Sequence, residues 1–360
     1  MAIDRRTFIQ AFAALGVMPV ATLARAGEPR PAFIAARLEG PSRFSVAVLD
    51  HAGELLFSED LDGRAHDIAI SPDARTAVVF ARRPGYFALV IDLEGQRRTT
   101  AFAPPDGRHF YGHGFFSADG RLLYATENDY DGERGVLGVY DPAAGYRRIG
   151  ELPTYGVGPH EALLMRDGHT IAIGNGGVIT HPDLDRVKLN LATMSPSLVY
   201  LDAATGDLIE KVELPAAQHQ LSIRHLAEAA DGTLWFGSQY EGAETDRIPL
   251  VGTHKRGSDA RLVGAPDDAY AGMRQYVGAM AINASGTRVA ATSPVGGHVL
   301  IFDATTRNLL ETRAIREVCG IAGDGGDFFS ADAGGHLWRG STLVSEFPGV
   351  MWDNHVRKIV

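Results

Sequence analysis

Hydrophobic residues occur along this chain in short runs separated by turns, and one polar phrase precedes such a run at regular intervals. In its clearest form the phrase is Gly158-Pro159-His160-Glu161, followed by a mostly apolar run and the turn Asp167-Gly168. Runs rich in Val, Ile, Leu, Phe and Tyr and bounded by Gly, Asp and Pro predict β-strands. The position of His160 in the phrase is occupied, over seven occurrences, by His66, His113, His160, His225, Ala279, Cys319 and His355.

The spacing of these occurrences predicts the fold. The intervals between them are 47, 47, 65, 54, 40 and 36 residues. A repeat of roughly 40–50 residues with four short strands is typical of a β-propeller blade. The second repeat contains four such runs, at 112–117, 122–126, 136–141 and 146–152. Several third strands end in Asp before a Gly-containing turn, which suits tight hairpins. We therefore predict an all-β fold, a seven-bladed β-propeller.

The two ends of the chain predict how the propeller closes. Residues 33–38, 44–50 and 54–61 form three predicted strands with no inner strand before them, and residues 351–359 supply an inner strand that carries the phrase. The last blade is therefore expected to combine the three N-terminal strands with an innermost C-terminal strand, which leaves no open sheet edge. A short helix is expected at 267–275.

The first 26 residues resemble an export signal. Arg5 and Arg6 form a twin-arginine pair with Phe8 close behind, and a modestly apolar stretch at 11–23 leads to Ala24-Arg25-Ala26. A charged start, a short apolar region and a small-x-small site make up a cleavable signal peptide. The sequence predicts a twin-arginine signal peptide at 1–26, a single propeller at 27–360, and a periplasmic protein.

Composition excludes several classes of protein. Apolar residues make up 45% of the 360 residues, which is ample for a large core. The net charge of −10 without a Lys/Arg run argues against nucleic-acid binding. The apolar stretch near the N-terminus is too short to span a bilayer, so no membrane span is expected after cleavage.

Cys319 is the only cysteine, so an intramolecular disulfide cannot form. We expect a monomer.

Propeller geometry should bring the repeated positions together, because the innermost strands start on one face around the channel. The loops between second and third strands open on the same face. Thirteen histidines in 360 residues would place about 0.25 histidines in any seven positions, and five are found. The five that should converge at the mouth of the channel are His66, His113, His160, His225 and His355.

Two interpretations of this histidine ring remain open. Neutral imidazoles suit a transition metal, with iron, copper and zinc all compatible, and three or four of the five would suffice. Unperturbed imidazoles would release the metal as pH falls through roughly 6. Alternatively, the ring is a structural hydrogen-bond network, as for the Gly-His pair of WD-repeat propellers, which Gly112-His113 resembles; the Trp-Asp partner of that network is missing here.

Other polar residues expected on this face are candidates for supporting the ring or forming its rim. Glu161 follows His160 on a strand and should point away from the channel, so it suits support better than ligation. Cys319 has the ring position, where a thiolate would favour softer metals and a buried thiol would be inert. The candidates for support or rim are Glu127, Asn128, Glu161, Asn175, His181, Gln239 and Glu241.

Several phrases together resemble a known family. They are Gly112-His113-Gly114, Thr126-Glu127-Asn128-Asp129, Gly158-Pro159-His160-Glu161, Asn175-Gly176-Gly177, Thr180-His181-Pro182-Asp183, Gln220-Leu221-Ser222-Ile223-Arg224-His225, Gln239-Tyr240-Glu241-Gly242 and Trp352-Asp353-Asn354-His355. Over about residues 30–357 the chain resembles domain-of-unknown-function family 1513, a group of twin-arginine-exported bacterial proteins. Such proteins tend to be encoded beside imelysin-like and di-haem peroxidase-like proteins, so the resemblance implies a role in iron acquisition, with other periplasmic iron-uptake proteins as partners.

Two functions of different class follow. The favoured one is a non-catalytic metal-binding or accessory protein of iron acquisition with its site at the channel mouth. The alternative is a metal-dependent propeller enzyme, such as a lactonase-like hydrolase or an oxidoreductase. The chain has no Gly-x-Ser-x-Gly elbow, phosphate loop or Cys-x-x-Cys-His sequence, and nothing assigns an acid–base pair. Hard cations in lactonase-type sites prefer carboxylate ligands, whereas a histidine ring favours a transition metal.

Overall fold

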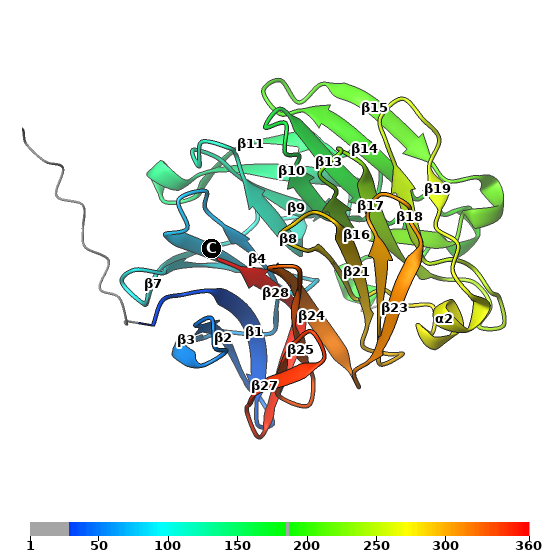
Figure 1. The fold of residues 1–360 in the computed structure, drawn as a ribbon. Helices are drawn as coiled ribbons and strands as arrows, with labels where there is room; N and C mark the ends of the chain where they lie inside the picture. The colour runs from blue at the N-terminus through cyan, green and yellow to red at the C-terminus, as the bar shows by residue number, and fades with distance from the viewer. Residues whose placement is uncertain (1–28, 185–186, 360) are drawn as a thin grey trace, which may run out of the picture.

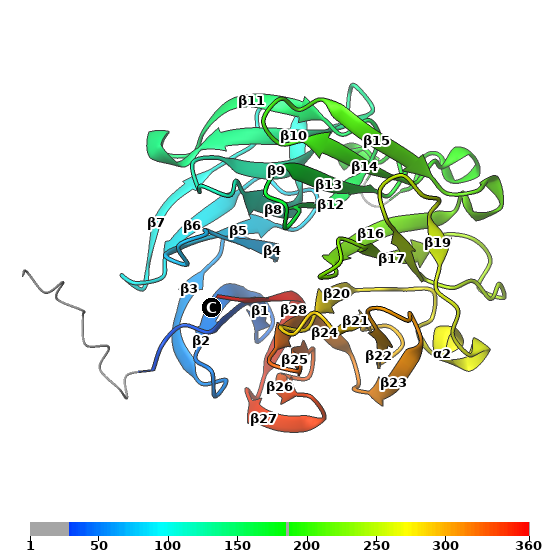
Figure 2. The same cartoon turned by 45° about the horizontal axis from the view of Figure 1, so that its top comes forward.

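Seven four-stranded antiparallel sheets surround a central axis in the computed structural model, which describes residues 29–184 and 187–359 (Figure 1). Figure 2 shows the innermost strands gathered near the axis and the outermost strands at the periphery. The prediction of a seven-bladed all-β propeller is confirmed. The proposed signal peptide at 1–26 lies outside the described residues.

In the first six blades, successive strands of the chain lie progressively farther from the axis. Blade one contains β4 (Ala65–Ile70), β5 (Thr76–Ala81), β6 (Ala88–Asp92) and β7 (Arg97–Phe102). Blade two contains β8 (Arg108–Phe116), β9 (Leu123–Asp129), β10 (Arg134–Asp141) and β11 (Arg147–Pro153). Blade three contains β12 (Pro159–Leu164), β13 (Thr170–Asn175), β14 (Ser197–Asp202) and β15 (Leu208–Glu213). Blade four contains β16 (Leu221–Glu228), β17 (Leu234–Tyr240), β18 (Val251–His254) and β19 (Arg261–Leu262).

Blade five contains β20 (Ala279–Ile282), β21 (Arg288–Ser293), β22 (His298–Asp303) and β23 (Leu309–Ala314). Blade six contains β24 (Val318–Asp324), β25 (Asp327–Asp332), β26 (His336–Arg339) and β27 (Thr342–Glu346). Blade seven contains, from the axis outward, β28 (Val350–Lys358), β1 (Phe33–Glu39), β2 (Arg43–Leu49) and β3 (Leu55–Asp60).

Blade seven closes the ring by joining the two ends of the chain, as predicted. β28 pairs antiparallel with β1, with Phe33 opposite Lys358 and Glu39 opposite Val350. The red C-terminal strand therefore lies beside the blue N-terminal strand (Figure 1). Phe33 also stacks on Phe329 of blade six, with ring centroids 3.9 Å apart. The N-terminal strands are thus tied to the C-terminal strand by backbone hydrogen bonds and to the neighbouring blade by packing.

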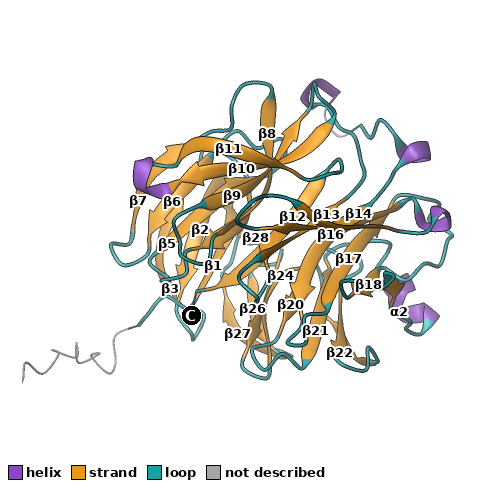
Figure 3. Ribbon diagram, turned by 90° about the horizontal axis from the view of Figure 1, so that it is seen from above, coloured by secondary structure: helices purple, strands orange, loops and turns teal. Residues whose placement is uncertain are grey.

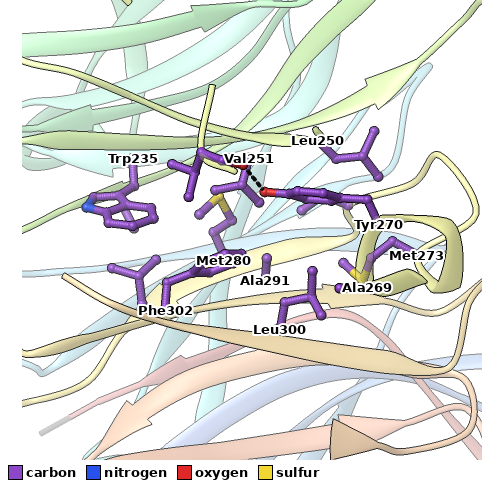
Figure 4. Packing of buried hydrophobic residues seen from close by; sticks show 14 of the residues in the cluster. Trp235, Leu250, Val251, Ala269, Tyr270, Met273, Met280, Ala291, Leu300 and Phe302 are labelled. Carbon is purple, nitrogen blue, oxygen red and sulfur yellow. Dashed lines mark hydrogen bonds between the residues drawn. The ribbon is translucent and has the colours of Figure 1, made fainter. Parts of the chain in front are cut away.

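The core lies between neighbouring blades, so middle strands are buried on both faces. All six residues of β13 are buried, whereas β15 at the periphery is largely exposed. Figure 4 shows one such interface, where Trp235 of β17 faces Phe302 of β22 with ring centroids 5.8 Å apart. The Tyr270 hydroxyl donates a hydrogen bond of 2.7 Å to the Val263 carbonyl, which satisfies the polar end of this buried ring.

Helical structure is limited to short segments at the periphery (Figure 3). The one α-helix of the described residues, α2 (Asp267–Gly272), ends three residues before the predicted limit, because Arg274 and Gln275 adopt positive φ angles of 48° and 59°. The described 3-10 turns are η1 (Pro142–Ala144), η2 (Pro182–Leu184), η3 (Leu191–Thr193) and η4 (Ala216–Gln218). Within the described ranges, every helix is too short to cross a membrane.

Candidate metal centre

β-Bulges on the innermost strands position the repeated histidines. A bulge disrupts the regular pairing and re-aims the side chains it contains. In blade five, where Ala279 replaces the histidine, β20 pairs with β21 without any shift. On the other innermost strands the register shifts fall between Ala65 and Ile68, Phe110 and Gly114, Pro159 and Glu161, Ile223 and His225, and Val318 and Ile321 around Cys319, and on β28 between Trp352 and Val356.

The glycine before His113 is required by the close approach of two rings. Gly112 has a φ of +109°, which side chains other than hydrogen rarely tolerate. A Cβ atom at this position would lie 2.8 Å from Cδ2 of His66. The Gly112-His113 pair therefore lets the rings of His66 and His113 meet with centroids 4.8 Å apart.

The structure brings all five predicted histidines together. Their ring centroids lie between 4.6 and 5.7 Å apart in the eight pairs that are in contact. Four of the side chains are buried, and His160 is partly exposed. We call the set the histidine cluster; its members are His66, His113, His160, His225 and His355.

Three groups of side chains around the cluster could hold a metal ion, since the ligand atoms within each group lie within 4.8 Å of one another. His113 belongs to all three groups, which makes it the geometric centre of the site. The groups are His66, His113 and His160; His113, His225 and His355; and Asp67, His113 and Glu161.

Two carboxylates and an arginine lie directly beneath the cluster. Asp67 Oδ2 is 2.8 Å from Nδ1 of His113, and Glu161 Oε2 is 3.3 Å from Nδ1 of His225. Arg357 bridges the two acids: its Nε donates to Asp67 Oδ1 at 2.6 Å and its Nη2 to Glu161 Oε1 at 2.8 Å. Burial of both acids is thereby compensated by ion pairing, since breaking such a buried pair typically costs about 3–5 kcal/mol.

The two ionised carboxylates determine which ring nitrogen of His113 and of His225 carries a proton. Burial alone would raise the pKa of Asp67, but Arg357 and then His113 hold that pKa well below its usual value. The pKa of Glu161 is lowered in the same way, with burial opposed by Arg357 and then His225. Because both acids are ionised, they accept a hydrogen bond from Nδ1–H, which leaves Nε2 of His113 and of His225 as the ring atom that could ligate a metal.

Four ring nitrogens of the cluster are buried without a hydrogen-bond partner among the described residues. Buried polar atoms are normally hydrogen-bonded, so each exception calls for a cause. A structural hydrogen-bond network would satisfy these atoms, whereas a metal site leaves lone pairs for the ion. The four atoms are His66 Nδ1, His113 Nε2, His160 Nδ1 and His355 Nε2.

Burial also favours the neutral form of several imidazoles in the cluster. Desolvation, followed by the neighbouring imidazoles, lowers the pKa of His66 and of His160 well below 6.5. Desolvation likewise lowers the pKa of His355 well below 6.5, although Asp67 acts in the opposite direction. Proton competition for a metal would therefore begin at a lower pH than the value near 6 that unperturbed imidazoles predict.

Sequence reasoning missed Asp67 and Arg357, although the repeats contain a signal for the acid. Asp67 follows His66 as Glu161 follows His160, and each acid binds the histidine of the next blade. Glu161 lies beneath the cluster, as its place after His160 on β12 suggests. Where the preceding blade has no acid after its histidine, the Nδ1 atom of the next histidine lacks a hydrogen-bond partner among the described residues. This is the case for His66 and His160.

Several predicted supporting residues lie elsewhere. The structure does not bring Glu127 to the cluster, because its side chain leaves β9 toward the outer strands, where it accepts from the Tyr140 hydroxyl at 2.6 Å and from Arg148 Nη2 at 3.0 Å. Asn128 lies 3.1 Å from His109 Nε2. Asn175, another predicted supporting residue, donates a hydrogen bond to the Thr154 carbonyl. His181 pairs with Asp131 and Asp183.

Cys319 stands at the ring position of blade six but is outside the metal-ligand groups of the described residues. Its Sγ is 3.2 Å from the Trp352 carbonyl and 3.3 Å from the Ala331 carbonyl. Burial raises the pKa of this thiol far above its usual value. The thiol is thus a protonated donor to backbone rather than a thiolate ligand.

A cavity of about 420 Å³ adjoins the cluster. His66, His160 and His225 line it on the side of the cluster, and the predicted rim residues Gln239 and Glu241 line it as well. Its other lining residues, which the sequence did not single out, are Arg82, Arg83, Tyr111, Lys188, Arg224, Tyr276 and Asn354.

The sequence that forms this site matches the model of a protein family. The family model described as "Protein of unknown function (DUF1513)" matches residues 59–359, which include the whole histidine cluster and the layer beneath it. The chain belongs to DUF1513. The model match begins within β3, so β1 and β2 lie outside it. Among curated proteins none matches this DUF1513 chain.

Solved structures share the fold of this DUF1513 protein. Kuenenia stuttgartiensis hydrazine synthase matches with a TM-score of 0.63 and 15% sequence identity, over 91% of this chain and 100% of that one. The β-propeller domain of Cps50 (Swd1) from Myceliophteria thermophila matches with a TM-score of 0.58 and 13% identity, over 84% and 96% of the two chains. At such identities the likeness shows the propeller fold alone.

Proposed function

We propose that this protein is a periplasmic, non-catalytic metal-binding protein that holds one transition metal ion in the histidine cluster and serves iron acquisition. The observation that carries the proposal is the set of four buried imidazole nitrogens without a partner among the described residues, drawn from His66, His113, His160 and His355. Imidazole nitrogens are good ligands for iron, copper and zinc, and poor ones for calcium or magnesium.

The residues divide into ligands and supports. His113 is the central ligand because every possible ligand group of the described residues contains it. Asp67 and Glu161 orient His113 and His225, in the manner of the carboxylates that support metal-binding histidines in other proteins. Arg357 pairs with both acids and offsets one of their two negative charges, so the layer beneath the imidazoles keeps one net negative charge.

The association of DUF1513 proteins with iron-uptake gene clusters, which the sequence resemblance implies, favours iron as the metal and other iron-uptake proteins as partners. The chemistry of the cluster itself is equally suited to copper and zinc. A non-catalytic role is favoured because the two carboxylates that contact the cluster are engaged in orienting imidazoles. An accessory protein needs only to bind the ion and present it at the channel mouth.

Titration of the metal-free mature protein with Fe(II), Cu(II) and Zn(II) should give one bound ion per chain for at least one of these metals. At a hundredfold excess over Kd, the melting temperature should rise by about 5 °C, since binding to the native state then contributes about 2.7 kcal/mol. Lowered pKa values keep His66, His160 and His355 neutral, so affinity should be similar at pH 7.5 and 6.0 and fall at lower pH. Calorimetry that detects no binding of any of the three metals would reject the proposal.

Export can be tested separately. The Arg5→Lys/Arg6→Lys precursor should remain in the cytoplasm, whereas the wild-type chain should appear in the periplasm with a new N-terminus near Gly27. Cell fractionation with N-terminal sequencing measures both results. The Gln10→Lys variant, which keeps both arginines, serves as a control and should be exported like wild type. Normal export of the double-lysine variant would contradict a periplasmic location reached by this pathway.

A further inference from the structure

The charged side chains that line the cavity beside the histidine cluster are mainly positive, although the chain as a whole is negatively charged. Four cationic side chains and one carboxylate line it, an excess of three positive charges, in a protein whose net charge is −10. Just behind the lining, Asp353 pairs with Arg82 and Arg64. The cations that line the cavity are Arg82, Arg83, Lys188 and Arg224.

Among these cations, Arg224 gives the strongest indication of a bound anion. Its side chain is only 7% exposed, and its Nη2 lies 3.4 Å from Glu241 Oε1, a long contact for an ion pair. Its Nε is buried with no hydrogen-bond partner among the described residues. Glu241 is shared with Lys188, so a single carboxylate faces both cations. A buried guanidinium that lines a cavity and has an unused donor suits an oxyanion, because guanidinium matches carboxylate and phosphate geometry.

The cations come from three separate parts of the propeller. Arg82 and Arg83 follow β5 of blade one, Lys188 lies in the insert of blade three, and Arg224 is on β16 of blade four. Cations supplied by three different blades suit a ligand with more than one anionic group. The volume of about 420 Å³ is in the range of small-molecule pockets.

We propose that this cavity binds a small multivalent oxyanion, a polycarboxylate or a phosphate, with one anionic group on Arg224 and another near Arg82 and Arg83. The His66 and His160 side chains line the same cavity, so the anion would lie against the histidine cluster. Its contact with a metal there rests on the proposed function, whereas the cationic lining does not depend on a metal.

Metal-free mature protein, stripped with the neutral chelator 1,10-phenanthroline and dialysed, should bind citrate or inorganic phosphate in a calorimetric titration at pH 7.5 and low ionic strength. Arg224→Gln and Arg83→Gln should each weaken binding about tenfold to hundredfold, as expected for loss of a charge-assisted hydrogen bond. Arg256→Gln is the matched control, because Arg256 pairs with Asp167 outside the cavity, and it should bind like wild type. Added salt should weaken the binding.

The outcomes separate the two proposals. Stronger binding of citrate than of phosphate identifies a polycarboxylate ligand, and the reverse order identifies phosphate. Anion binding by a protein that fails to bind any metal would uphold the anion site and reject the metal site. Failure of metal-free protein to bind either anion, or binding that is the same in Arg224→Gln, Arg83→Gln and wild type, would overturn the anion proposal. Melting curves of each variant check that it is folded.

Discussion

Deleting residues 351–360 is expected to leave the protein unable to reach its native fold. The deletion removes nearly all of β28, the innermost strand of blade seven, and leaves β1 with an unpaired edge. Val356 and Ile359 are each less than 10% exposed, and burying such a side chain contributes about 1.5–3 kcal/mol. Loss of Arg357 also leaves Asp67 and Glu161 as buried charges without their partner. Together these losses approach the entire stability of a typical domain, about 5–15 kcal/mol.

A circular permutant provides the control, because it moves the chain ends without removing a strand. The Ile359 amide donates to the Ala32 carbonyl at 2.8 Å, so a short linker can join the natural ends. New ends between Glu244 and Thr245, two exposed residues, leave every blade intact. Size-exclusion chromatography and thermal melting should show a folded monomer for the permutant and aggregation for the deletion. A monomeric deletion with an unchanged melting temperature would contradict the closure of blade seven.

Substituting three residues of the cluster, as His113→Ala/His160→Ala/His225→Ala, is expected to abolish metal binding. Structural zinc sites with four ligands have apparent binding free energies of about 10–16 kcal/mol, so each ligand contributes roughly 3 kcal/mol. Removing three would leave too little free energy for measurable binding. Calorimetry with Fe(II), Cu(II) and Zn(II) at pH 7.5 compares the variant with wild type, and the metal-dependent rise in melting temperature should vanish in parallel.

The matched control is His254→Gln, since His254 of β18 is as buried as most of the cluster but contacts Tyr200 of blade three and the Ser258 carbonyl of blade four. It should bind metal like wild type even if it lowers the melting temperature. The glutamine version of the triple substitution keeps more of the side-chain volume and guards against misfolding of the alanine version. A folded triple variant that binds as tightly as wild type would show that the cluster is not the site.

Much of the architecture and the five histidines could be predicted because both repeat along the chain. A propeller blade needs an inner strand at each interval, so the phrase around His160 marks every blade, including the one shared between the chain ends. The bulges that aim the histidines into the channel are not visible in the spacing. One of them, between Phe110 and Gly114, contains His113.

The surroundings of the cluster were harder to predict because they depend on which side chains meet across blades. Arg357 contacts two acids that lie 290 and 196 residues away in sequence, and a local sequence pattern does not predict such a long-range contact. Glu127 looked equally suitable as support for the cluster, but alternation along β9 turns its carboxylate toward Arg148. The cations of the cavity likewise come from three blades and gather only in the folded protein.

The most direct test of the metal-binding account is the first coordination shell of the bound ion, measured by X-ray absorption on wild-type protein loaded with one equivalent of Zn(II). The account predicts three or four imidazole nitrogens at about 2.0–2.1 Å, with the outer-shell scattering that imidazole rings produce. A shell made of oxygen or sulfur atoms without imidazole scattering would place the metal elsewhere and contradict the histidine cluster as its site.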